Sequence, residues 1–214
     1  MRQMERDAEV VLVHGLWHGS WAMMSLARRL RRAGYALRFF KYRPTVSSLA
    51  SHASDLAQFV GRSEATKVHY VGHSLGGLVI LQMLCSRFAV PSGRVVLLGT
   101  PLQGSEVVRR VARLPGAHAF LGQAAEGLAR GVPGLVEGHE IGVIAGTRAV
   151  GIGRLLGQPA QGSDGTVALA ETDAPYLSGR IALPVSHTGL LYSAAVAQSV
   201  SSFLESGSFS QGSG

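Results

Sequence analysis

A serine set between glycines, where a strand pattern changes to a helix pattern, constrains this chain most. The stretch Val71-Gly72-His73-Ser74-Leu75-Gly76-Gly77 contains Gly-x-Ser-x-Gly. The apolar run Val68–Val71 predicts the end of a buried strand, and Leu78–Phe88 predicts a helix. Glycines suit a tight turn between them, because a Cβ would clash across it. Such a turn raises the Ser74 hydroxyl above the sheet and points helix N–H groups at it, so Ser74 is the candidate nucleophile. The alternative is a glycine-rich turn without chemistry.

Strand-like apolar runs alternate with helix-like segments, which predicts an α/β fold. The expected strands are Glu9–Val13, Ala36–Tyr42, Val68–Val71, Arg94–Leu98, Glu140–Ala145 and Arg180–Val185. The expected helices are Trp21–Gly34, Leu49–Gly61, Leu75–Phe88, a segment within Ser105–Arg130, and Leu190–Leu204. Because the alternation is typical of right-handed βαβ units, we expect a mostly parallel six-stranded sheet with helices on both faces. Ligands of such sheets bind beyond the carboxyl ends of the strands.

Length and composition fit one folded domain. The 214 residues suit a single α/β unit, and 46% hydrophobic against 15% charged residues allow a sizeable core. We expect the domain to span residues 1–205, followed by a flexible Ser- and Gly-rich tail at 206–214. Residues 102–136 carry apolar positions interrupted by Pro115-Gly116. Two interpretations stay open for them: two short helices that form a lid or pocket wall, or an ordinary crossover helix with a break.

Composition and missing motifs argue against several other classes of function. No apolar run reaches the roughly 18 residues of a membrane span. The net charge of +7 comes partly from arginine clusters, which we interpret as solvated helix faces capable of weak contact with anionic surfaces. No nucleic-acid fold signature accompanies them, so we expect no nucleic-acid partner. The histidines show no metal-ligand spacing, so we expect no metal. The single cysteine, Cys85, excludes an intrachain disulfide.

A serine hydroxyl is a weak nucleophile and needs a base, which is usually a histidine held by a carboxylate. After a turn of this kind the partners follow in the order Asp or Glu, then His. This order leaves His118, His139 and His187 as candidate bases. His187 follows the last expected strand, whereas His118 lies in the uncertain helical region and His139 precedes a strand. We therefore predict His187 as the base.

The predicted acid is Asp164, in the loop Gly162-Ser163-Asp164-Gly165 after the expected strand Glu140–Ala145. Its place beyond a strand's carboxyl end is the edge where Ser74 is expected. Glu171 and Asp173 are the rivals, and both lie close to the amino end of the final strand. The alternative for Asp164-Gly165 is a simple turn.

An oxyanion hole needs two backbone donors. We predict them at Leu75, which follows the nucleophile, and at Leu16, in the loop Val13-His14-Gly15-Leu16-Trp17-His18-Gly19 after the first strand. Trp17 is expected to border the substrate pocket, although an aromatic packed under a helix is an alternative. Phe120 and Leu121 are expected on the other side of an apolar acyl pocket.

These motifs together resemble the α/β-hydrolase superfamily, and more narrowly the small bacterial lipases and esterases with a minimal core. The resemblance rests on His14-Gly15, Gly72-His73-Ser74-Leu75-Gly76-Gly77, Asp164-Gly165 and His187-Thr188-Gly189-Leu190-Leu191-Tyr192-Ser193. It covers about Val10 to Leu204 and implies an ester-hydrolysing serine enzyme without cofactor. The segment Leu102–Val136 departs from the family by being longer and more helical than in the smallest lipases.

The resemblance implies a small-molecule or lipid ester as substrate. An acyltransferase or a thioesterase would use the same residues, and a non-catalytic binding protein of this fold is the alternative from another class. Members of the group are usually secreted, but no signal segment precedes the first expected strand. We therefore expect a cytoplasmic location, or secretion if a leader has been removed.

Overall fold

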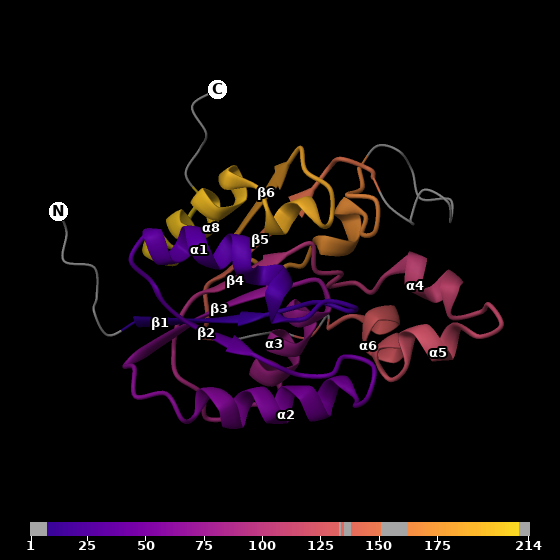
Figure 1. Ribbon diagram of the computed structural model, residues 1–214, viewed down its shortest axis with the longest axis horizontal. Helices are drawn as coiled ribbons and strands as arrows, with labels where there is room; N and C mark the ends of the chain where they lie inside the picture. The colour runs from indigo at the N-terminus through magenta and orange to yellow at the C-terminus, as the bar shows by residue number, and fades with distance from the viewer. Residues whose placement is uncertain (1–7, 133, 135–137, 151–161, 210–214) are drawn as a thin grey trace.

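The computed structural model describes residues 8–132, 134, 138–150 and 162–209. Its centre is one all-parallel six-stranded sheet in the order β2-β1-β3-β4-β5-β6 (Figure 1). The strands are β1 Ala8–Val13, β2 Ala36–Phe40, β3 Lys67–His73, β4 Val95–Leu98, β5 Ile141–Gly146 and β6 Gly179–Leu183. This sheet confirms the predicted fold class. Two strands end earlier than predicted, β2 at Phe40 rather than Tyr42 and β6 at Leu183 rather than Val185.

Helices cover both faces of the sheet (Figure 1). One face carries α1 (Met24–Arg32) and α8 (Ala194–Ser206), and the other carries α2 (Leu49–Val60) and α3 (Leu75–Cys85). Strand β1 shows why both layers form. Its residues Val10 and Leu12 pack with the α1 and α8 side, whereas Val11 and Val13 pack with the α2 and α3 side. Alternate side chains of a strand point to opposite faces, so a strand covered on both faces is apolar throughout.

Buried strand residues supply much of the driving force for folding. All four residues of β4, Val95 to Leu98, are fully buried. Burying a side chain of this size contributes about 1.5–3 kcal/mol relative to exposing it. The central strands β3 and β4 therefore form a rigid base for the loops at their carboxyl ends.

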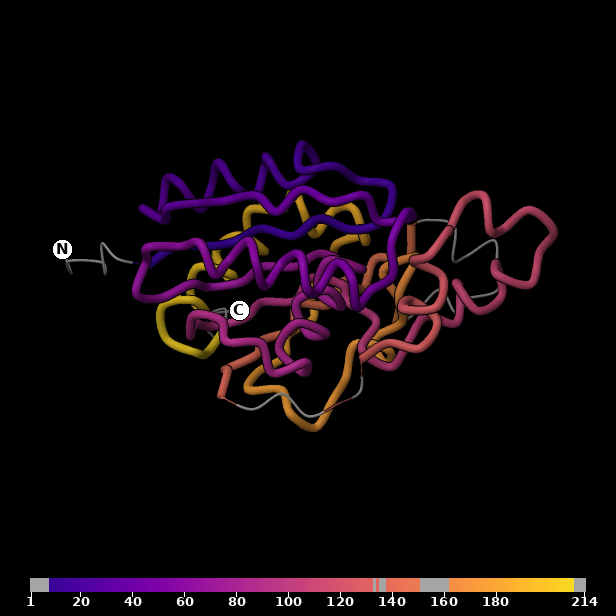
Figure 2. Tube along the Cα trace, turned by 90° about the horizontal axis from the view of Figure 1, so that it is seen from below, coloured from indigo at the N-terminus to yellow at the C-terminus, as the bar shows by residue number. Residues whose placement is uncertain are grey.

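A helical insert follows β4 and projects from one end of the molecule (Figures 1 and 2). It consists of α4 (Glu106–Val111), α5 (Ala117–Leu121) and α6 (Ala124–Arg130). The sequence predicted two short helices or one broken helix, whereas the described part of this segment has three, because Gly122, with a φ of 51°, turns the chain between α5 and α6. Within 102–136, positions 133, 135 and 136 lie outside the described residues.

Among the described residues, the structure also has the 3₁₀ turns η1 (Ser20–Met23), η2 (Leu169–Thr172) and η3 (Gly189–Leu191). The C-terminal end differs from the predicted flexible tail at 206–214. Ser206 is the last residue of α8, and the Phe209 ring packs against Phe203 with 4.7 Å between ring centroids. The apolar Phe209 therefore extends the packed fold past the predicted boundary, and residues 210–214 lie outside the described part. Among the described residues, no helix has the length and apolar character to cross a membrane.

Candidate active site

Ser74 stands on a sharp turn between β3 and α3. Its φ of 53° and ψ of −121° are unusual for a residue with a side chain, and its N–H donates to the Leu98 carbonyl at 2.9 Å. A Cβ at position 72 would lie 2.6 Å from the Gly77 Cα, and one at position 76 would overlap the Val13 carbonyl. Strained backbone of this kind persists only where the surroundings enforce it, and it clusters at functional sites.

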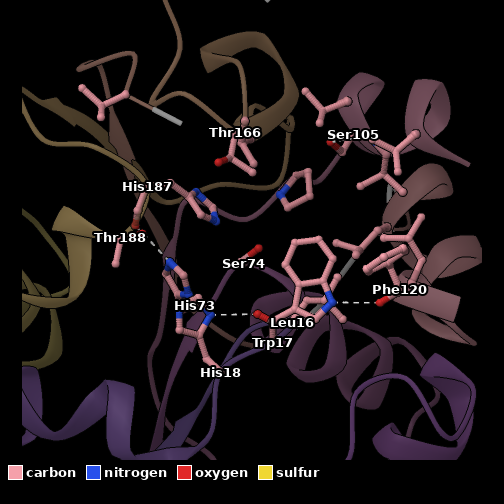
Figure 3. A pocket seen from close by; sticks show the side chains of 18 of the residues that line it. Leu16, Trp17, His18, His73, Ser74, Ser105, Phe120, Thr166, His187 and Thr188 are labelled. Carbon is pink, nitrogen blue, oxygen red and sulfur yellow. Dashed lines mark hydrogen bonds between the residues drawn. The ribbon is translucent and has the colours of Figure 1, made fainter. Parts of the chain in front are cut away.

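Asp164 and His187 form a buried hydrogen-bonded pair beyond the carboxyl ends of β5 and β6. The His187 Nδ1 lies 2.7 Å from the Asp164 Oδ2. The other carboxylate oxygen, Oδ1, accepts from the N–H groups of Thr166 at 2.9 Å and Val167 at 2.7 Å. Because Asp164 is 1% exposed, these partners compensate for the water that its carboxylate loses. The arrangement assigns the Nδ1 proton to the carboxylate side and leaves Nε2 free to face Ser74 (Figure 3).

The rival residues have other roles. Glu171 accepts from the N–H of Ala168 at 2.8 Å and of Glu106 at 2.6 Å, so it caps a turn. Asp173 pairs with Arg180 at 3.1 Å. His118 is exposed on α5, and His139 lies before β5 with its ring 6.4 Å from Tyr70. Neither of these two histidines lines the pocket that holds Ser74.

The loop after β1 passes directly against the nucleophile candidate. A Cβ at Gly15 would lie 3.1 Å from the Ser74 Cβ, which is tighter than an ordinary contact, so glycine favours this close approach. The next residue, Leu16, lines the same pocket as Ser74, and Leu75 is the first residue of α3, where helix N–H groups lack helical partners. Both predicted oxyanion donors thus lie beside Ser74.

Trp17 stands at the pocket edge rather than under a helix. It has a φ of 56°, it is 61% exposed, and its indole N–H donates to the Phe120 carbonyl at 2.8 Å (Figure 3). This bond joins the loop after β1 to α5. The predicted pocket residues Phe120 and Leu121 differ in exposure, since Phe120 is 67% exposed and Leu121 is 2% exposed.

Ser74 and His187 open into a pocket of about 520 Å³ (Figure 3). Its apolar wall is formed largely by the helical insert, through Val107, Val108, Val111, Leu114, Phe120, Leu121 and Leu128. Val150, Thr166, Val167 and Thr188 line it elsewhere. The volume suits a small organic molecule, and the wall suits an apolar group.

Two glycines make room for the acid and the base, and the sequence analysis missed both. Gly99, directly after β4, has a φ of 55°, and a Cβ there would lie 3.0 Å from the His187 Nδ1 and 3.1 Å from the Asp164 Oδ2. Gly146, at the end of β5, would place a Cβ 2.7 Å from the Asp164 Cβ. Each of these two glycines directly follows an expected strand, Arg94–Leu98 or Glu140–Ala145, and that position was the signal available in the sequence.

Histidines surround the site beyond the predicted base. Burial and, to a smaller extent, His187 hold the pKa of His73 well below its ordinary value of 6.5. Burial also lowers the pKa of His14, whose ring stacks on Tyr42 with 4.6 Å between centroids. No group of three or more metal-binding side chains occurs among the residues that the structure describes.

Comparison with known sequences identifies the family. Residues 10–199 match the alpha/beta hydrolase family. The chain belongs to this family, which places it among the hydrolases. A carbendazim hydrolyzing esterase of Nocardioides sp. (strain SG-4G) is 37% identical over 86 residues. That match covers 34% of each protein, so it spans about a third of the esterase.

Solved structures share the fold at low sequence identity. The mature lipase BlEst2 of Bacillus licheniformis superposes with a TM-score of 0.72 and 21% identity, over 92% of this chain and 90% of the lipase. The NocB thioesterase domain from the nocardicin cluster superposes with a TM-score of 0.59 and 17% identity, over 93% of this chain and 94% of that domain. The first of these two likenesses supports the predicted resemblance to lipases and esterases in fold.

Proposed function

We propose that the protein is a serine carboxylester hydrolase, an esterase or lipase that works through an acyl-enzyme. The observation that carries the proposal is the 2.7 Å bond between His187 and Asp164 at a pocket that also holds Ser74 on its strained turn. A hydroxyl and an imidazole that line one apolar pocket, with a buried carboxylate bonded to the imidazole, are the parts that acyl transfer requires.

The proposed cycle begins with attack of the Ser74 Oγ on the ester carbonyl carbon. His187 takes the serine proton at Nε2, and Asp164 holds the ring through Nδ1 and stabilises the imidazolium. The N–H groups of Leu16 and Leu75 hold the oxyanion. His187 then donates its proton to the leaving alcohol. Water repeats the steps and releases the carboxylic acid, so neither a metal nor a cofactor is needed.

The apolar wall of the pocket suggests which part of the substrate binds where. We assign the acyl chain to the space between Trp17 and the helical insert, because Leu121 and Leu128 present buried apolar surface there. Removing a methylene from water contributes about 0.8 kcal/mol. The substrate class is therefore an ester with an apolar acyl group, from a small molecule or a lipid.

A fluorophosphonate probe tests the proposal most directly. The wild-type protein should be labelled once, at Ser74, and the Ser74→Ala variant should remain unlabelled. A profile across p-nitrophenyl esters of increasing chain length, with emulsified triglyceride alongside, then defines the acyl preference. Absence of both labelling and ester turnover in a folded sample would favour a non-catalytic binding protein.

A thioesterase or an acyltransferase would use the same residues. The fold shared with the NocB thioesterase domain is compatible with the thioesterase alternative. Assays with acyl thioesters, and product analysis with added alcohols, separate these activities. If a thioester is turned over faster than the matched oxygen ester, the substrate class is a thioester, and the proposed roles of Ser74, Asp164 and His187 stay the same.

A further inference from the structure

We propose that His73 is a positioning residue that ties the His187 loop to the Ser74 turn; this role rests on the proposed function of those two residues. His73 precedes the serine and is the last residue of β3. Its Nε2 lies 3.1 Å from the His187 backbone carbonyl, to which it donates (Figure 3). One side chain thus connects the neighbour of the nucleophile to the base.

The hydrogen bond from His73 is one of three hydrogen bonds that hold His187 in place. Its backbone N–H donates to the Asp164 carbonyl at 3.0 Å, and its ring Nδ1 donates to the Asp164 carboxylate at 2.7 Å. His73 holds the third polar atom, the carbonyl oxygen. The ring Nε2 is then the remaining polar atom of His187, and it is the atom that must reach Ser74. Because acyl transfer depends on distances of about 3 Å, a loosely held base would lose rate.

His73 performs this task only as a neutral ring. It is fully buried, and its Nδ1 has no hydrogen-bond partner within the described part of the chain. Donation from Nε2 leaves Nδ1 unprotonated, so a second proton would be buried without an acceptor. The titratable groups that face the ring are His187, at 4.7 Å between centroids, His18, at 5.8 Å, and His14. All are histidines, so none stabilises a positive charge on His73.

The neutrality has a further consequence for the proposed cycle. His187 becomes an imidazolium when it accepts the serine proton, and its ring lies directly against His73. A charged His73 would oppose that step by like-charge repulsion in a buried place. The low pKa of His73 keeps the ring a fixed hydrogen-bond donor while its neighbour changes charge.

Three variants separate positioning from packing. Gln at position 73 can still donate from its side-chain amide toward the His187 carbonyl, Asn is too short, and Leu fills space without a donor. We expect His73→Leu and His73→Asn to lower kcat by about 10- to 100-fold with KM nearly unchanged, and His73→Gln to recover most of the loss. If Leu retains activity as well as Gln, His73 only packs, and the proposal fails.

A second measurement reports on the base without turnover. The short bond between His187 and Asp164 should give a low-field proton resonance, which should persist in wild type and His73→Gln and broaden in His73→Leu as the loop loosens. An unchanged resonance in a folded His73→Leu protein would overturn the positioning role. Fluorophosphonate labelling of wild-type Ser74 tests the proposed function separately, so failure of either idea can be recognised by itself.

Discussion

The two sides of the pocket are built in opposite ways. On one side, Asp164, His187 and His73 are polar, no more than 8% exposed and joined by hydrogen bonds. On the other side, Trp17 and Phe120 are apolar and more than 60% exposed. The polar groups lie inside, and large aromatic rings face the solvent. This inverts the usual distribution, and it fits the proposed function, in which the polar side needs fixed geometry and the aromatic side contacts an apolar ligand.

The supports of the two sides differ as well. The polar side rests on the ends of β3 to β6, where parallel strands and glycines hold each residue. The other side, the pocket mouth around Trp17 and Phe120, is formed largely by the three helices of the insert. These have six, five and seven residues and are too short to be stable alone. They depend on packing against α3 and on contacts such as the bond from Trp17 to Phe120. We therefore expect mutations on the polar side to change rate and mutations at the mouth to change selectivity.

Loss of the nucleophile, base or acid is expected to have the largest effect. Ser74→Ala or His187→Ala should lower kcat by about three to six orders of magnitude with the fold intact, because these groups act as a unit. Asp164→Asn should also be severe. Circular dichroism checks folding, and ester hydrolysis measures the rate. The control is Asp173→Asn on the exposed surface; if it abolishes turnover while Asp164→Asn does not, the proposed acid is wrong.

A pair of glycine substitutions compares the two sides directly. Gly99→Ala places a methyl group 3.0 Å from the His187 Nδ1, whereas Gly116→Ala, between α4 and α5, meets no atom within 4 Å. Both positions have positive φ, so both variants carry a similar backbone strain of about 1–2 kcal/mol. Only Gly99→Ala should lower kcat, by about 10- to 100-fold. Equal effects of the two variants on kcat would show that strain, and not displacement of His187, is responsible.

Substitutions in the insert should alter chain-length preference. Activity should rise about fourfold for each added acyl methylene until the pocket is filled, as 0.8 kcal/mol per methylene implies. Phe120→Ala and Leu121→Ala should flatten or shift this optimum more than they change acetyl-ester turnover. The exposed Val46, which does not line the pocket, provides the control Val46→Ala. If the Phe120 and Leu121 variants affect all esters equally, the acyl chain binds elsewhere.

Lowering the pH should reduce the free energy of unfolding through buried histidines such as His73, and not through the exposed residues of the pocket mouth. The pKa of His73 in the folded protein lies below its ordinary value of 6.5, so below about pH 6.5 the unfolded chain binds a proton that the folded chain does not. The free energy of unfolding therefore falls as pH falls, by at most about 1.4 kcal/mol per pH unit for each such group. His14 and His52 contribute with the same sign.

Urea denaturation between about pH 5 and pH 8 measures this slope. His73→Gln should make the free energy of unfolding less dependent on pH, by the contribution of one titrating group. The same change at the exposed His118 on α5 should leave the pH dependence as in wild type. A slope that stays the same in His73→Gln would show that His73 is not held neutral in the folded protein.

The sequence by itself was enough to predict the parallel sheet and the candidate residues Ser74, Asp164 and His187, in that order along the chain. Strong local patterns carry this information: apolar strands such as Val95–Leu98 are short and uninterrupted, and glycines around Ser74 permit one tight turn. Chain order and strand ends also sufficed to prefer Asp164 and His187, the pair that the structure places 2.7 Å apart.

Only the tertiary structure decided how the pocket is completed. The bond from Trp17 to Phe120 joins residues 103 positions apart, and the bond from His73 to His187 joins residues 114 apart. No local pattern encodes such pairs, because they form only when the sheet brings the ends of different strands together. The need for glycine at position 99 is of the same kind: the atoms that a Cβ would meet belong to Leu190, His187 and Asp164, which lie far along the chain.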